Sequence, residues 1–135
     1  MDITIVLCTY NRCGFLATAL SSAVASVLPE SVEWEILVVD NNSKDATREV
    51  VEGFYKQYPS RIRYLFEPKQ GKSNALNTGI REARGNILAF MDDDVRVETD
   101  WLQKLTAPLQ DPQWAGAGGR VEAVSPDTPE IQCVR

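Results

Sequence analysis

Apolar and polar residues follow one another in blocks that predict strands and helices in turn. Short runs rich in Val, Ile and Leu predict buried strands at residues 3–8, 34–40 and 87–91. Residues 62–66 alternate apolar and polar side chains, which indicates a strand with a wetter face or at a sheet edge. Between these strand segments the apolar residues recur at a different spacing.

Apolar residues at helical spacing predict helices between the strands. The expected helical stripes run through residues 15–28, 50–58, 75–83 and 100–105. Pro29 is expected to stop the first helix, Asn42 or Ser43 to cap the second, and Gly85 to occupy the C′ position of the third. Because strand and helix alternate four times, we expect an α/β fold, with a mostly parallel sheet and helices on both faces. We see no boundary, so residues 1–135 are predicted to form a single domain.

Three adjacent carboxylates, Asp92, Asp93 and Asp94, follow the apolar run at 87–91. Open α/β sheets bind ligands at the carboxyl ends of their strands. Crowded carboxylates repel one another unless a cation neutralises them, and Mg²⁺ or Mn²⁺ does so when a substrate phosphate completes the shell. The alternative is a polar strand end followed by a solvated turn.

Two other predicted strands also end in polar residues. Thr9, Tyr10 and Asn11 follow the first strand, and Asp40 ends the second. Together with the aspartates they would suit a nucleoside diphosphate, because the ring and acceptors fit the nucleoside while a metal ion separates the diphosphate from the acidic edge. For Asp40 alone, an acid favoured by a helix dipole is an equal alternative.

Gly71-Lys72-Ser73 suggests a phosphate-binding loop, but the full motif needs glycine where Phe66 stands. Lys72 can still reach a phosphate, as can Arg12 or Lys69. A solvated lysine at a helix start explains Lys72 equally well.

Composition narrows the classes of partner. The chain of 135 residues carries 19 acidic and 14 basic residues, a formal charge of -5, which argues against binding nucleic acid or an anionic membrane. No apolar run reaches the roughly 18 residues of a membrane span.

The sequence has no histidine, so no imidazole base is available. Cys8, Cys13 and Cys133 form neither a CxxC pair nor an even set, which favours a cytoplasmic location.

Five blocks of sequence, in order, resemble the inverting family 2 glycosyltransferases. The resemblance spans residues 3 to 121. The blocks are 6–12 (VLCTYNR), 36–45 (ILVVDNNSKD), 71–79 (GKSNALNTG), 85–94 (GNILAFMDDD) and 116–121 (GAGGRV).

This resemblance implies a GT-A fold and a nucleotide-sugar donor, commonly UDP-linked, with a divalent cation and a hydroxyl acceptor. By this resemblance Thr9, Tyr10 and Asp40 would contact the nucleobase, with Asn11 in the same loop. Lys72 would lie near the nucleotide and Asp93 near the ribose. Asp94 would bind the metal, and Asp92 would fill the first place of the DxD motif beside it. The catalytic base stays unassigned, although Asp100 and Asp127 are available acids.

The resemblance ends at residue 121, before the part that binds the acceptor in family members. We therefore expect the chain to be the donor-binding half, with residues 125–129 in a loop. An uncovered sheet edge near the C-terminus would favour self-association.

Other classes remain as alternatives. One alternative is a binding module that holds nucleotide and metal without turnover. A nucleotidyltransferase would bring a Gly-rich, Arg-containing loop after the first strand, and residues 9–14 lack it. A phosphorelay receiver needs a phosphoacceptor at the end of its third strand, where Phe66-Glu67-Pro68 stands.

Overall fold

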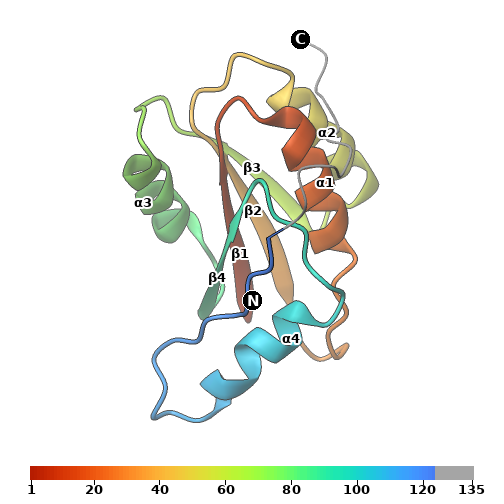
Figure 1. Cartoon of the computed structure of the whole chain (residues 1–135), viewed down its shortest axis with the longest axis vertical. Helices are drawn as coiled ribbons and strands as arrows, with labels where there is room; N and C mark the ends of the chain where they lie inside the picture. The colour runs from red at the N-terminus through yellow and green to blue at the C-terminus, as the bar shows by residue number, and fades with distance from the viewer. Residues whose placement is uncertain (124–135) are drawn as a thin grey trace.

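The structure is a computed structural model and describes residues 1–123. The predicted alternation of strands and helices is confirmed (Figure 1). In chain order the elements are β1 (Ile3–Thr9), α1 (Cys13–Val24), β2 (Trp34–Asp40), α2 (Thr47–Gln57), β3 (Ile62–Phe66), α3 (Lys72–Glu82), β4 (Ile87–Asp92), α4 (Trp101–Thr106) and a 3₁₀ turn (Ala107–Gln110).

The four strands form one parallel sheet in the order β3-β2-β1-β4. Figure 1 shows α3 on one side of the sheet and α1 and α2 on the other. β1 and β2 lie in the middle, and β2 is buried along its whole length. This arrangement explains why both strands read as nearly continuous apolar runs, because parallel strands covered on both faces have no solvent side.

The core has two layers, one on each face of the sheet. The larger layer joins the sheet to α1 and reaches Leu102 of α4, and the smaller joins Leu37 and Val39 to Ala75 of α3. Gly79 lets α3 approach closely, because a Cβ there would lie 2.5 Å from Val6 Cγ1. No helix within residues 1–123 is long and apolar enough to cross a membrane.

Two helix boundaries differ from the prediction. α1 ends at Val24, because the backbone N–H of Val27 donates to Thr99 O instead of continuing the helix. Neither Asn42 nor Ser43 caps α2, which begins at Thr47. In both places a contact with a distant or neighbouring segment overrides the local signal.

The prediction for Gly85 is wrong. α3 ends earlier, with Ala83 already extended, so Gly85 is not its C′ residue. Gly85 instead packs on β1, where a Cβ would lie 2.4 Å from Thr4 N. Residues 116–121 are exposed and form no strand, since they pair with no strand among the described residues.

Candidate functional site

The register of the sheet brings three strand ends to one level. Thr9 lies opposite Asp40 on β2, and Cys8 lies opposite Asp92 on β4. The loops that follow these strands surround a cavity of about 380 Å³, within the size range of small-molecule sites. Its lining residues are Cys8, Thr9, Tyr10, Arg12, Asn41, Gln70, Gly71, Lys72, Ala75, Asp92, Asp93 and Asp94.

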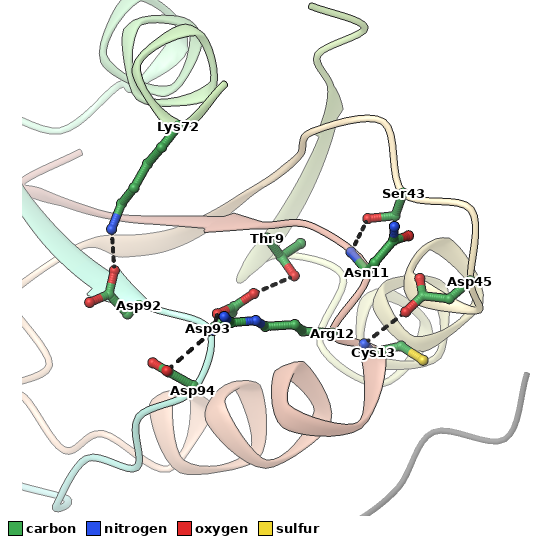
Figure 2. Close-up of polar contacts among 10 residues, drawn as sticks. All are labelled: Thr9, Asn11, Arg12, Cys13, Ser43, Asp45, Lys72, Asp92, Asp93 and Asp94. Atoms are coloured by element: carbon green, nitrogen blue, oxygen red, sulfur yellow. Dashed lines mark hydrogen bonds and ion pairs between the residues drawn. The ribbon is translucent and has the colours of Figure 1, made fainter. Parts of the chain in front are cut away.

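The three aspartates of the triplet have different surroundings (Figure 2). Asp92 accepts a bond from Lys72 Nζ at 3.0 Å. Asp93 is buried and accepts from Thr9 Oγ1 at 2.9 Å. Asp94 accepts from Arg12 Nη1 at 3.2 Å. Asp92 is therefore tied to the start of α3, whereas Asp93 and Asp94 are tied to the end of β1 and the residues that follow it.

Two cations compensate the three carboxylates. Arg12 Nη1 also lies 3.5 Å from Asp93 Oδ1, and the ion pair with Asp92 raises the pKa of Lys72. Burial raises the pKa of Asp93, although the hydrogen bond from Thr9 and the charge of Arg12 partly oppose this effect. Because three negative charges face two positive ones, the site keeps a net attraction for a further cation.

The predicted metal ligands, Asp92 and Asp94, do not lie together as a preformed cage. β4 ends at Asp92 and the chain turns at the next two residues, so Asp92 points to Lys72 and Asp94 to Arg12 (Figure 2). Within residues 1–123 no group of three or more acidic or cysteine side chains is gathered to hold a metal. The side chains of Asp92 and Asp94 are nevertheless 61% and 47% exposed. This donor set fits Mg²⁺ or Mn²⁺, which takes one or two carboxylates and completes its shell with water and substrate phosphates.

The polar residues predicted after β1 are divided between two places. Thr9 and the half-exposed ring of Tyr10 line the cavity. Asn11 does not, because its backbone has a positive φ of 50° and its Oδ1 accepts from Lys44 N at 2.7 Å. Asn11 instead lines a neighbouring hollow of about 300 Å³. Its predicted contact with the substrate stays a prediction.

Asp40 is buried at the end of β2 and does not line the cavity. One of its oxygens accepts from Ser43 N at 2.9 Å and the other from Tyr64 Oη at 2.7 Å. The carboxylate therefore already shapes the loop that follows β2. Its predicted role toward the nucleoside remains a prediction.

Sequence reasoning did not select Asn41 or Gln70, which line the cavity. It named Gly71 only within an incomplete phosphate-loop motif, and Arg12 only as one of several cations that can reach a phosphate. Asn41 follows Asp40 at the same strand end, so the rule that selected the other strand ends would have found it. The contribution of Gln70 has no such signal, since its place depends on contacts made across the fold.

Further predictions concern the remaining acids and the cysteines. Asp100 does not line the cavity and pairs with Lys104 at 2.6 Å, while Asp127, the 125–129 loop and Cys133 lie outside the described residues. Cys8 is a free thiol at the cavity, and burial raises its pKa to about 11, so it stays protonated near neutral pH. The location expected from the cysteines remains a prediction.

Comparison with known structures defines the class of the protein. The mannosyltransferase PcManGT of Pyrobaculum calidifontis, in complex with GDP-Man and Mn²⁺, superposes with a TM-score of 0.76 and 29% identity, over 82% of this chain and 33% of that one. S. aureus TarS 1–349 in complex with UDP gives a TM-score of 0.71 at 24% identity, over 82% of this chain and 32% of that one, which supports the fold. The fold is that of the GT-A glycosyltransferases.

Sequence comparison gives the family. The model of glycosyl transferase family 2 matches residues 4–133, so the chain belongs to this family. Glycosyltransferase AglE of Haloferax volcanii is 30% identical over 93% of the chain, and succinoglycan biosynthesis protein ExoM of Rhizobium meliloti is 35% identical over 91%. The chain spans 41% and 40% of the lengths of these two relatives.

Proposed function

We propose that this chain forms the donor site of a metal-dependent, inverting glycosyltransferase that uses a nucleotide sugar, with UDP as the nucleotide. One observation carries the proposal: the ends of β1, β2 and β4 meet at a cavity that holds an exposed aromatic ring, two cations and two accessible carboxylates. A nucleoside diphosphate needs this combination, because its base stacks on a ring while its phosphates attract cations and a bound metal ion.

Each part of the donor has a matching group in the cavity. The ring of Tyr10 is available to stack on the base, and Thr9 and Asp93 lie together beside it as polar partners for the ribose. Lys72 and Arg12 are placed to contact the diphosphate once their carboxylate partners turn to a metal ion. Asp92 and Asp94 would hold that ion, which supplies Lewis-acid stabilisation of the leaving group.

In the proposed reaction an acceptor hydroxyl oxygen bonds to the anomeric carbon from the face opposite the nucleotide. The bond from that carbon to the diphosphate oxygen breaks, its electron pair leaves with the nucleoside diphosphate, and a general base takes the hydroxyl proton. We assign no described residue as this base. Binding without turnover is therefore the second candidate.

The proposal is tested by calorimetric titration with UDP and with GDP, each in Mn²⁺ and in EDTA. GDP is included because the mannosyltransferase of similar fold is complexed with GDP-Man and Mn²⁺. We expect UDP to bind only with the metal, and Asp94→Asn to weaken that binding by about tenfold or more, because a charged ligand is lost while the half-exposed site keeps its fold. Equal affinity in EDTA would refute the metal role, and equally weak binding of every nucleotide would refute the donor site.

A further inference from the structure

We propose that Asn41 is a positioning residue, which anchors the loop 67–71 as one wall of the cavity and thereby sets the place of Lys72. The nature of the ligand rests on the proposed function, whereas the anchoring does not. Asn41 is 5% exposed and lies directly after β2. Its backbone N–H donates to Thr9 O at 2.9 Å, so the residue is itself fixed to the end of the neighbouring strand.

The side chain of Asn41 is fully used by the loop. Its Nδ2 donates to Glu67 O at 3.1 Å and to Lys69 O at 2.8 Å, and its Oδ1 accepts from Gly71 N at 3.0 Å. Two backbone carbonyls cannot donate, so the orientation of the amide follows from its partners. Its backbone oxygen also accepts from Gln70 Nε2 at 2.7 Å. One residue therefore satisfies polar groups along the whole loop.

Other residues hold the two ends of the loop. In its second half, Asn74 Nδ2 donates to Gln70 O at 2.9 Å. Glu67 is held independently, because its backbone N–H donates to Asp40 O and its carboxylate accepts from Thr78 Oγ1. Gly71 adopts a φ of 128° and leads directly into Lys72, the first residue of α3. Residues 70–72 line the cavity, so a displacement of Gly71 also moves the backbone from which the Lys72 ammonium group reaches Asp92.

Only an amide meets these requirements at position 41. A carboxylate would keep the acceptor for Gly71 N but would place an oxygen against the carbonyls of Glu67 and Lys69. An apolar side chain would leave all three backbone groups without this partner. We therefore expect Asn41→Asp to release the loop while the strands below it remain paired.

The experiment measures loop release and nucleotide binding on the same variants of the full chain. We expect trypsin to cleave after Lys69 in Asn41→Asp about tenfold faster than in the wild type, and the affinity for UDP with Mn²⁺ to fall by about tenfold. Asn86→Asp is the matched control, because it makes the same charge change at an exposed position just before β4. Gly85→Ala is the control for stability, since it strains β1 far from the cavity and should leave the affinity unchanged.

The outcomes separate the two proposals. Unchanged cleavage after Lys69 in Asn41→Asp would overturn the anchoring, and faster cleavage with unchanged affinity would overturn the positioning role. If the wild type binds no nucleotide, the proposed function fails while the cleavage rates still decide the anchoring. Should Asn41→Asp not fold, Gln70→Ala removes one bond of the same set from an exposed residue, and we expect several-fold faster cleavage from it. A rate equal to the wild type would overturn the anchoring.

Discussion

At the scale of single residues, Arg12 pairs with carboxylates that a metal ion would also bind. Its guanidinium group lies within 3.5 Å of Asp93 and Asp94 and is half-exposed, so it can leave these carboxylates without unfolding the chain. A metal bound at Asp94 would repel it toward an incoming diphosphate. On this proposal Arg12 would oppose metal binding before the nucleotide binds and would favour the nucleotide afterwards.

Arg12→Gln should therefore act in opposite directions on two measurements. We predict tighter Mn²⁺ binding in the absence of nucleotide, because a competing charge is removed, and several-fold weaker UDP binding at saturating Mn²⁺, because a phosphate contact is lost. Calorimetry measures both. Arg48→Gln is the control, since Arg48 is an exposed partner of Glu52 on α2. A change of the same sign in both titrations would contradict the exchange.

Sequence patterns predicted the residues of the site better than their partners. Thr9, Tyr10 and the aspartates were selected because polar residues at the ends of parallel strands share one edge. Lys72 was selected from the Gly-Lys-Ser sequence that it belongs to. The pairing of Arg12 with Asp94 joins residues 82 positions apart in the chain, and it depends on β1 lying beside β4. No local pattern encodes that neighbourhood.

At the scale of elements, the turn between α3 and β4 packs against β1, and this contact limits which residues the turn accepts. Gly85→Ala should lower the free energy of unfolding by about 1–3 kcal/mol, because the new Cβ would overlap the backbone of Ile3 and Thr4. Gly53→Ala in α2 meets no atom within 4 Å and should raise it by about 0.5–1 kcal/mol. Urea unfolding of both variants checks the contrast, and equal effects would contradict it.

A buried carboxylate links three strands at the opposite end of the sheet. Glu35 on β2 accepts from Thr4 Oγ1 at 2.9 Å and from Arg63 Nε at 2.8 Å. Burial alone would raise the pKa of Glu35, but the hydrogen bonds from Arg63 and Thr4 outweigh it, so the pKa lies below its ordinary value of 4.5. A carboxyl with a lowered pKa stabilises the fold above the unfolded-state pKa, and this contribution is lost as the pH falls through the folded-state pKa.

Glu35→Gln should consequently cost about 3 kcal/mol of stability near neutral pH, because Arg63 loses its charged partner. The difference from the wild type should shrink as the pH falls below 4.5, where the wild-type carboxylate itself becomes protonated. Urea unfolding across this pH range measures the difference. A difference that does not change with pH would show that the charge of Glu35 contributes nothing.

The elements themselves were largely predictable, and their ends were not. Strand segments were found because parallel strands buried on both faces are unbroken apolar runs. The end of α1 was missed because Val27 continues the helical spacing, although its backbone bonds to Thr99. Gly85 was assigned to a helix end for the same reason: its tertiary contact with β1 leaves no trace in the local sequence.

At the scale of the whole molecule, β4 lies at an edge of the described sheet and carries the exposed aromatic residue Phe90. We predict that the 135-residue chain self-associates through this edge, and that Phe90→Lys shifts it toward the monomer. Tyr55→Lys on α2 is a matched control, because the exposures of Phe90 and Tyr55 are 51% and 49%. Sedimentation velocity measures the distribution, and an equal effect of both substitutions would contradict the assignment of this edge.

The central claim is that a nucleoside diphosphate and a metal ion bind together where β1, β2 and β4 end. Paramagnetic broadening of backbone amide signals by Mn²⁺ in the presence of UDP locates the ion directly. The account predicts that signals of Tyr10, Lys72 and Asp94 are lost, that those of Asp2 and Trp34 at the other end of the strands persist, and that Asp94→Asn removes the effect. Broadening centred on any other part of the chain, or unchanged in Asp94→Asn, would contradict it.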